Sequence, residues 1–448
     1  MKMSRKNPIL NLFFRYLVYI LYGWKILLLT FGMKRYKRFN STKMIFLFYL
    51  IVGKVLIPMD MSQVDHLRAY GIAYRALELG IKVEWLLNYR GGAFLMDESS
   101  KVEELCKMRG VSYEVIGEGM VQSIYSTIEE ENMERVELTV APRVAVYVPP
   151  HQTPWDDAVR IALEYAEIPY DKIWDEEVLG GVLADYDWLH LHHEDFTGQY
   201  GKFYGNYKNA PWFKKEVETN KFMANKLGFK KVWQLKHSVA DKVAEYVKGG
   251  GFLFAMCSAT ETIDIALAAS GMDIVPLIDG DGYEPDCQVK LNFGRTFAFR
   301  NFEVDLNPMR YRHSSIDMTD EVRTFGQQTY FKLFSFSAKY DPIPTLLTQN
   351  HTKSIAEFLG QTTGFRRALI KDNVAILGDI PETPEVKYIY GDYGKGFFTF
   401  YGGHDPEDYA HLVGDPPTRL EIHPNSPGYR LILNNVLFPA AKSKRLKT

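Results

Sequence analysis

The chain has 448 residues, of which 46% are hydrophobic, 24% charged and 14% aromatic. So much apolar surface excludes a disordered chain, and three cysteines are too few for a disulfide-stapled fold. Residues 1–53 carry ten basic side chains and no acidic one, which leaves 43 basic and 55 acidic residues in the remainder. An acidic body argues against nucleic acid as a partner, because phosphate contacts need a basic surface.

The basic N-terminal region, residues 1–53, contains two apolar stretches. The first (residues 10–31) is interrupted by basic side chains, and the second (residues 44–52) precedes a glycine. A basic segment, a short apolar run and a small residue are together typical of a secretory signal. We therefore predict an exported protein of the periplasm or cell envelope, which is anchored in the membrane if this region is retained. Two alternatives stay open: residues 1–32 are an upstream extension, or residues 44–57 hold the first buried strand.

A small α/β unit is predicted over residues 54–141, because short apolar runs alternate with segments of helical spacing. The expected elements are strands at 55–57, 83–87 and 113–116 and helices at 62–79 and 101–109. A helix between two strands of one sheet forms a right-handed crossover, which implies that the strands are parallel. Residues 118–141 are acidic and are expected to form a connecting helix or a linker.

A larger α/β domain is predicted over residues 142–440. The expected strands are 144–148, 168–173, 188–192, 252–256 and 397–401, and the expected helices are 154–166, 213–227, 234–248, 262–269 and 429–437. The uninterrupted apolar run of 252–256 is typical of a parallel sheet that is covered on both faces. The predicted fold class is therefore α/β with a parallel sheet, preceded by the smaller unit and followed by a basic tail at 441–448.

Cys257 lies between the predicted strand 252–256 and the helix that follows it. A nucleophile at such a turn sits at the end of the sheet, where a helix N-terminus lowers the pKa of a thiol. Ala255 and Ala259 leave room for a strained turn, and the amides near 258–259 are the expected oxyanion donors. The alternative is a buried structural cysteine, since free cysteine is among the most buried residue types.

A thiol nucleophile needs a base, and His404 is one candidate. It follows an apolar strand and two glycines, which predicts that a tight turn presents it at the end of the sheet. Asp405 or Glu407 would orient the imidazole, as the acid of a catalytic triad does. A turn histidine with solvated acids beside it is the alternative interpretation.

A second polar cluster consists of His190, His192, His193, Glu194 and Asp195. The first two histidines share one face of a predicted strand and, with nearby carboxylates, could bind zinc or a similar metal, but the sequence assigns no third ligand. We therefore predict no resident metal and no cofactor, and we interpret the cluster as substrate-binding residues at the carboxyl edge of the sheet. Ser258 and His351 are expected to line the same pocket.

Several strings resemble the class I glutamine amidotransferase-like fold and its ThuA-like branch. Residues 255–259 (AMCSA) are similar to the nucleophile elbow of that fold, with alanine in place of both flanking glycines. Residues 402–407 (GGHDPE) resemble its late His-Pro-Glu signature with one residue inserted. Residues 394–404 and 431–438 resemble its closing strand and final helix. The resemblance implies a flavodoxin-like, class I glutamine amidotransferase-like domain over residues 142–440.

The body of the chain also resembles a set of Bacteroidetes proteins labelled asparagine synthetase B. Residues 188–200 (WLHLHHEDFTGQY) and 347–352 (LTQNHT) carry this resemblance. An asparagine synthetase needs an N-terminal cysteine and an SGGxDS loop for pyrophosphate. This chain begins Met-Lys-Met-Ser and lacks such a loop, so ATP-dependent synthesis of asparagine is not expected.

Together these patterns predict a Cys-dependent amidase or hydrolase. Cys257 is the expected nucleophile and His404 the expected base. The alternative is a catalytically inactive module of the same fold that binds a sugar or a peptide. The expected partner is therefore a small molecule, a glycan or a peptide, and the oligomeric state is left open.

Overall fold

The computed structural model describes residues 53–150, 156–276, 278, 282–324 and 329–441. The predicted export segment lies outside these ranges except for Gly53, and the predicted basic tail lies outside them except for Ala441. Across the described ranges, no helix combines the length and the apolar character needed to cross a bilayer. The described residues form one compact unit, which contains both sheets.

The first sheet has five antiparallel strands. They are β1 (Lys54–Ile57), β2 (Val83–Leu87), β3 (Ala93–Asp97), β4 (Glu114–Ile116) and β5 (Glu134–Leu138), in the spatial order β4-β1-β3-β2-β5. A turn over residues 88–92 joins β2 to β3, and a connection so short joins only antiparallel strands. The predicted parallel arrangement of this unit is therefore wrong, because it omits β3, the hairpin partner of β2.

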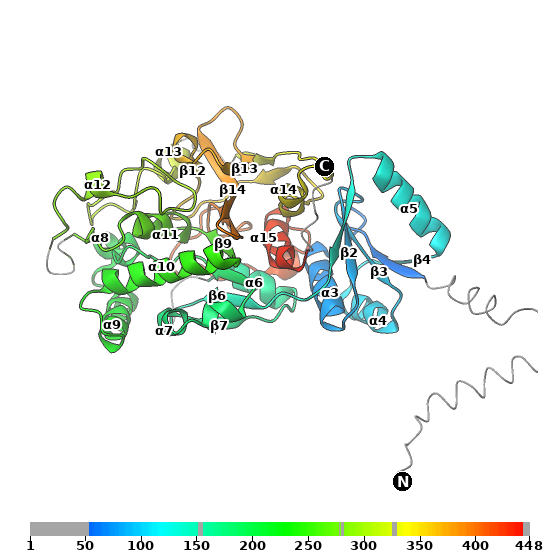
Figure 1. Cartoon of the computed structure of the whole chain (residues 1–448), viewed down its shortest axis with the longest axis horizontal. Helices are drawn as coiled ribbons and strands as arrows, with labels where there is room; N and C mark the ends of the chain where they lie inside the picture. The colour runs from blue at the N-terminus through cyan, green and yellow to red at the C-terminus, as the bar shows by residue number, and fades with distance from the viewer. Residues whose placement is uncertain (1–52, 151–155, 277, 279–281, 325–328, 442–448) are drawn as a thin grey trace, which may run out of the picture. The chain divides into compact units, whose positions relative to one another are not determined.

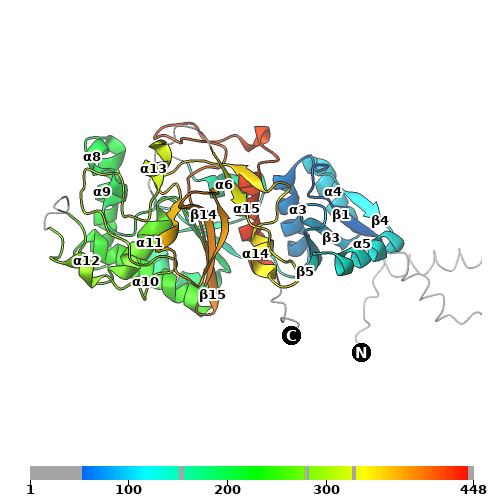
Figure 2. The ribbon, with the colours of Figure 1, turned by 90° about the horizontal axis from the view of Figure 1, so that it is seen from above.

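Helices cover both faces of this sheet (Figures 1 and 2). α3 (His66–Glu78) and α4 (Ser100–Arg109) pack on one face, and α5 (Glu118–Glu130) packs on the other. The pleat of the strands determines this division, since successive side chains point to opposite faces. Along β1, Val55 belongs to the core with α3, whereas Leu56 belongs to the core with α5.

The second sheet has ten strands and is mixed. They are β6 (Val144–Tyr147), β7 (Asp171–Ile173), β8 (Trp188–Leu191), β9 (Phe252–Met256), β10 (Tyr330–Leu333), β11 (Ser354–Ala356), β12 (Phe365–Arg366), β13 (Val374–Asp379), β14 (Glu385–Tyr393) and β15 (Gly396–Tyr401). The strand order is β11-β10-β13-β14-β15-β9-β8-β6-β7, and β12 pairs with β14. Strands β7, β6, β8, β9 and β15 run parallel, and the strands from β14 onward pair antiparallel.

The predicted parallel, flavodoxin-like or class I glutamine amidotransferase-like sheet is therefore wrong. Four of the strand pairs in this sheet are parallel and five are antiparallel. The sequence prediction placed no strand between 256 and 397, where β10 to β14 lie. A two-residue turn joins β14 to β15, and a turn so short allows only antiparallel pairing. Its first residue, Gly394, has a φ of +68°, which suits such a hairpin turn.

Helices pack on both faces of the second sheet as well. α6 (Ala158–Tyr165) and α15 (Pro427–Leu437) lie on one face, and α10 (Val232–Gly249) and α11 (Ala259–Ala268) lie on the other. Helix α3 of the first sheet contacts both α6 and α15. The three helices α3, α6 and α15 therefore form one hydrophobic core between the two sheets.

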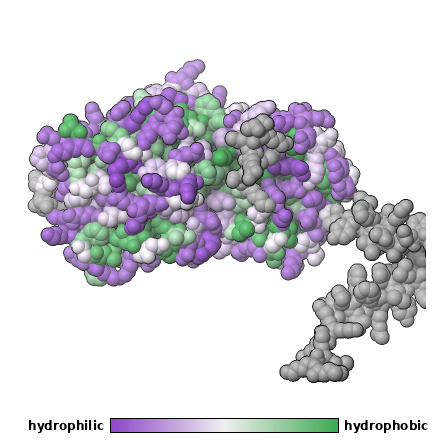
Figure 3. Space-filling view, viewed as in Figure 1, coloured by the Kyte–Doolittle hydropathy of each residue, from purple (hydrophilic) through white to green (hydrophobic). Residues whose placement is uncertain are grey.

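The remaining helices are short or peripheral. They are α7 (Asp175–Leu179), α8 (Tyr204–Tyr207), α9 (Pro211–Lys226), α12 (Cys287–Lys290), α13 (Thr319–Thr324) and α14 (Pro342–Leu347), with 3₁₀ turns η2 (Val182–Asp185), η3 (Tyr200–Lys202), η5 (Arg367–Leu369), η6 (Leu420–Ile422) and η7 (Phe438–Ala440). The space-filling view shows hydrophilic side chains over most of one face, with apolar ones between them in separate groups (Figure 3).

Candidate functional site

Three neighbouring parallel strands, β8, β9 and β15, end at the same edge of the second sheet. His192 and His193 follow β8, Cys257 follows β9, and His404 comes three residues after β15. Main-chain hydrogen bonds join these loops. The Cys257 N–H donates to Gly403 O at 3.1 Å, and the Ala259 N–H donates to His192 O at 3.0 Å. The chemistry-bearing residues of the three loops are thus held close together.

Cys257 sits on a strained turn between β9 and α11. Its φ is +49°, a left-handed conformation that is uncommon outside glycine and typical of a nucleophile at a strand-to-helix turn. Only 2% of the residue is exposed, and burial raises the pKa of its thiol to about 11. The main-chain N–H of Gln361 points at Sγ from 3.4 Å.

A cavity of about 290 Å³ opens beside this sulfur atom. Its lining residues are His193, Phe203, Cys257, Tyr311, Leu359, Gly360, Gln361, His404, Ala410, His411, Leu412 and Val413. Cys257 and three imidazoles therefore share one cavity. Among the residues that the structure describes, no imidazole nitrogen makes a hydrogen bond with Sγ; the thiol's donor is the Gln361 amide.

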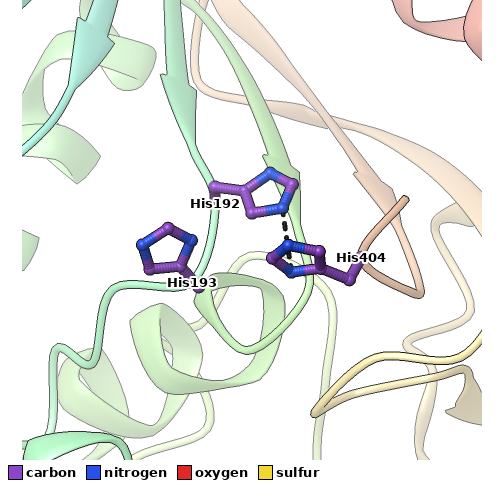
Figure 4. Close-up of side chains that lie close together, drawn as sticks. All are labelled: His192, His193 and His404. Atoms are coloured by element: carbon purple, nitrogen blue, oxygen red, sulfur yellow. Dashed lines mark hydrogen bonds between the residues drawn. The ribbon is translucent and has the colours of Figure 1, made fainter. Parts of the chain in front are cut away.

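The imidazoles of His190, His192 and His404 form a row at this edge of the sheet, and Figure 4 draws the last two. His190 Nδ1 lies 3.1 Å from the carbonyl oxygen of Phe254, and His190 Nε2 lies 3.3 Å from His192 Nδ1. His192 Nε2 lies 3.2 Å from His404 Nδ1, and His404 Nε2 lies 3.0 Å from the carbonyl oxygen of Asp156. The row therefore runs from one main-chain carbonyl group to another.

The Asp157 carboxylate lies beside this row. Its Oδ1 accepts hydrogen bonds from the main-chain N–H groups of Val159 (2.9 Å) and Arg160 (3.1 Å), and so caps the N-terminus of α6. The same oxygen lies 3.4 Å from His190 Nε2 and 3.6 Å from His192 Nδ1. Burial opposes ionisation, but the histidines hold the pKa of this carboxyl well below its ordinary value, so Asp157 is an anion.

Three of the imidazoles at this edge, those of His192, His193 and His404, are neutral. Burial lowers the pKa of His192 to about 3 and, together with the neighbouring rings, places the pKa values of His193 and His404 well below the ordinary histidine value. A neutral imidazole carries one N–H group and one nitrogen lone pair. Each of these rings therefore offers one lone pair to a proton donor or a metal ion.

Ligand atoms of His192, His193 and His404 all lie within 4.8 Å of one another. His192 and His404 are buried, and His193 is half-buried on the cavity wall. The ring centroid of His192 lies 4.5 Å from that of His404 and 5.4 Å from that of His193. These three side chains, drawn in Figure 4, are a group that can hold a cation.

His411 is a site residue that the sequence prediction omits. Its ring stacks on His404 with a centroid separation of 4.3 Å. His411 Nδ1 donates to Asp408 Oδ2 at 2.9 Å, and His411 Nε2 lies 3.4 Å from Asp156 Oδ1. In a catalytic triad a carboxylate holds the base at Nδ1 in the same way. The signal in the sequence is the i, i+3 spacing of Asp408 and His411 in the turn after β15.

Neither acid that was expected to orient His404 contacts its ring. Asp405 Oδ1 accepts from the main-chain N–H of Glu407 at 2.9 Å. Glu407 forms an ion pair with His423 at 3.0 Å. The ring of His404 is oriented by His192 and by the Asp156 carbonyl oxygen instead. Asp156 and Asp157, which lie near the start of the predicted helix 154–166, are the residues that organise the row.

Two other predicted binding residues, Glu194 and Asp195, support the loop that follows β8. Glu194 Oε2 accepts from the main-chain N–H of His192 at 2.8 Å, and burial raises its pKa to about 8. Asp195 accepts from Thr197 N–H at 2.7 Å and pairs with His313 at 3.5 Å, so it stabilises the loop after β8. Both act on the loop and do not line the cavity.

Ser258 and His351 were expected to line the pocket, and neither is among its lining residues. Ser258 is fully buried at the start of α11. His351 stacks on His66 with a centroid separation of 4.3 Å, and its Nδ1 lies 3.0 Å from a guanidinium nitrogen of Arg430. The Ala259 amide, an expected oxyanion donor, is already bonded to His192 O, so the Gln361 amide is the donor that faces the thiol.

No protein-family model matches the chain, and neither does any curated protein. Two proteins of Salmonella typhimurium described as cytoplasmic proteins are similar in structure. One shares 12% identity over 67% of this chain and 100% of its own length, with a TM-score of 0.34. The other, from strain LT2, shares 11% identity over 67% of this chain and 99% of its own length, with a TM-score of 0.33.

A β-galactosidase from Bacillus circulans sp. alkalophilus is also similar in part. It shares 12% identity over 59% of this chain and 29% of its own length, with a TM-score of 0.24. Likenesses of this size carry no statement about activity, so the function of this chain is argued from the site itself.

Proposed function

We propose that the chain is a hydrolase in which Cys257 attacks the carbonyl group of a small amide or ester bound in the 290 Å³ cavity. One observation carries the proposal: a cysteine with left-handed backbone geometry lines the same cavity as an imidazole that a carboxylate holds at Nδ1. A positioned thiol and an oriented imidazole are the two parts that nucleophilic catalysis at a carbonyl group needs.

His411 is the base in this proposal. The resting thiol is protonated, because burial raises its pKa to about 11, so a nearby base must accept the proton during attack. His404 is less suited, since its Nδ1 faces His192 Nε2 and its Nε2 donates to the Asp156 carbonyl oxygen. His411 Nδ1 is committed to Asp408, whereas His411 Nε2 lies 3.4 Å from Asp156 Oδ1 without a hydrogen bond among the described residues and is left to accept a proton.

The reaction follows from these roles. Cys257 Sγ forms a bond to the carbonyl carbon while the thiol proton passes to His411 Nε2, and the Gln361 N–H stabilises the developing oxyanion. The proton then moves to the leaving amine or alcohol, which departs and leaves a thioester. Water hydrolyses the thioester, which releases the acid and restores the thiol.

A second candidate function is a ligand-binding module without chemistry. It is favoured by one observation: Cys257 is buried, and its sulfur accepts a hydrogen bond from a main-chain amide N–H and makes none with an imidazole of the described residues. In this alternative the cavity holds its ligand through the surrounding histidines alone.

Alkylation of the native full-length chain separates the two. We expect iodoacetamide to modify Cys257 at least about tenfold faster than Cys106, which is also buried but lies on α4 and does not line this cavity. Modification is mapped by peptide mass spectrometry, with Cys257→Ser as the blank. His411→Gln should slow the labelling, whereas His423→Gln should not. Equal rates at the two cysteines would contradict the nucleophile and favour the module.

A further inference from the structure

His192 lies between His190 and His404 in the row of imidazoles. The Phe254 and Asp156 carbonyl oxygens only accept hydrogen bonds, so His190 donates from Nδ1 and His404 donates from Nε2. The other nitrogen of each ring, His190 Nε2 and His404 Nδ1, faces His192.

The two ring nitrogens of His192 face different groups. Its Nδ1 faces His190 Nε2 and the Asp157 carboxylate, at 3.3 Å and 3.6 Å. Its Nε2 faces His404 Nδ1 across 3.2 Å. Two imidazole nitrogens that point at each other across this distance are placed as two ligands of one metal ion are.

The observed separation matches a tetrahedral metal centre. Zinc bound by imidazole nitrogens at about 2.0–2.1 Å places two ligand atoms about 3.3 Å apart. The His192–His404 pair lies at 3.2 Å, and one ring nitrogen from each of His192, His193 and His404 lies within 4.8 Å of the other two. Three histidines with a fourth position left open are the ligand set of catalytic zinc sites.

The outer contacts of these rings are also those of metal ligands. A metal-bound histidine donates its second ring N–H to a carbonyl oxygen or a carboxylate. His404 donates to the Asp156 carbonyl oxygen at 3.0 Å. His192 Nδ1 faces His190 and the buried Asp157 carboxylate, whose negative charge compensates part of the charge of a dication.

We propose that His192, His193 and His404 bind one divalent metal ion, with zinc as the ion that fits three imidazole nitrogens in tetrahedral geometry. His193 and His404 line the cavity, so the open position of the ion faces the same space as Cys257. A divalent ion polarises a carbonyl oxygen, which matches the substrate class of the proposed hydrolase. The metal site does not rest on the thiol chemistry, since its ligands do not include Cys257.

Zinc titration of the full-length chain tests the site. After removal of bound metals with a chelator and exchange into metal-free buffer, calorimetry should show one zinc per chain with a dissociation constant below about 1 µM. His193→Gln and His404→Gln should each weaken binding at least about 100-fold, and Asp157→Asn should weaken it about 10- to 100-fold through the outer contact. His423→Gln, a histidine outside the cluster, is the matched control and should leave binding unchanged.

Cobalt supplies a readout that does not depend on the variants folding. Co²⁺ bound by the unsubstituted chain should give the intense visible bands of a tetrahedral centre, and zinc should displace it. Failure of the unsubstituted chain to bind zinc at micromolar concentration, or an unchanged affinity in a folded His193→Gln chain, would overturn the site. Cys257→Ser should bind zinc normally while losing alkylation, so that the metal site and the thiol chemistry are judged separately.

Discussion

Two cavities lie at opposite ends of the parallel strands, and the side chains that line them differ in chemical character. The larger, of about 1070 Å³, lies where β9 and β15 begin and is lined mainly by apolar and aromatic side chains such as Tyr390, Phe397 and Phe438. The smaller, of about 290 Å³, lies where the same strands end and holds Cys257 and three imidazoles. The polar cluster thus lies in the smaller of these two cavities.

The difference follows from how parallel strands are built. At their carboxyl ends the loops turn into helix N-termini, as Cys257 turns into α11, and polar side chains converge there. At their amino ends the strands are entered from helix C-termini and glycine turns, such as Gly249 to Gly251 after α10. The predictions below set the two ends against each other.

The largest effect is expected at Gly403, which supports the smaller cavity. Its φ is +92°, and an added Cβ would lie 2.5 Å from the ring of Phe358. Gly403→Ala should therefore lower the free energy of unfolding by about 3 kcal/mol, through backbone strain and overpacking together.

Gly414 is the matched control, because its φ is +96° and an added Cβ would have no atom within 4 Å. Gly414→Ala should cost only about 1 kcal/mol, from the backbone term alone. Urea unfolding of both variants measures the difference. If the two substitutions lower the free energy of unfolding by the same amount, the close contact of Gly403 with Phe358 does not contribute to the stability of the loop that carries His404.

A pH effect of similar size is expected at His313, which supports the loop after β8. Burial opposes its charged form, but the Asp195 and Glu261 carboxylates outweigh burial and raise its pKa to about 9, from an ordinary value of 6.5. The stabilisation is complete below pH 6.5 and is lost as the pH rises through 9. The loss should be on the order of 3 kcal/mol.

Unfolding by urea at several pH values measures this effect. In His313→Gln the decline between neutral and alkaline pH should flatten, since the group that releases the proton is gone. A slope that persists unchanged in this variant would show that another group is responsible.

A smaller loss is expected at the apolar end. Phe438 is 7% exposed and packs against Phe252 and Phe397 in the wall of the larger cavity. Phe438→Ala should cost about 2–3 kcal/mol, below a fully enclosed phenylalanine, because one side already faces the cavity. The alkylation rate of Cys257 should stay within about twofold of the unsubstituted chain. A large change in that rate would mean that the two ends are coupled.

The smallest effect is expected at the rim of the larger cavity. Lys242 and Glu245 form an ion pair one turn apart on α10, with side chains that are 45% and 65% exposed. Lys242→Ala should change the free energy of unfolding by less than about 0.5 kcal/mol, because exposed pairs are screened by water and salt. A loss above about 1 kcal/mol in thermal or urea unfolding would contradict this.

The sequence predicted local elements well where the pattern was strong. Strand 83–87 is β2, and the helices expected at 101–109 and 234–248 are α4 and α10. These segments have clear apolar periodicity and stop at Gly110 or Gly250. The pairing of the strands could not be read in the same way, because parallel and antiparallel strands have the same side-chain alternation. The sequence does not predict the hairpin strands β13 and β14, because polar residues interrupt their apolar pattern.

The site was predicted in part. Cys257 and His404 come to one cavity because both follow adjacent parallel strands, which is a rule of the fold. The i, i+2 spacing placed His190 beside His192. The contributions of Asp157 and His411 depend on how separate loops pack against one another, and the one local signal for them is the i, i+3 spacing of Asp408 and His411. The wrong acids for His404 were chosen for the same reason, since nearness in sequence was taken for nearness in space.

The main-chain bonds between the three loops have a consequence for protein engineering. The Cys257 N–H donates to the Gly403 carbonyl oxygen, and the Ala259 N–H at the start of α11 donates to the His192 carbonyl oxygen. These main-chain bonds hold the rim, that is, the loops after β8, β9 and β15, and they do not involve the thiol or the imidazole groups. Sulfur can therefore be exchanged for oxygen or selenium, and imidazole for other donors, on an unchanged frame. The rim offers a scaffold on which new reactivities can be compared one atom at a time.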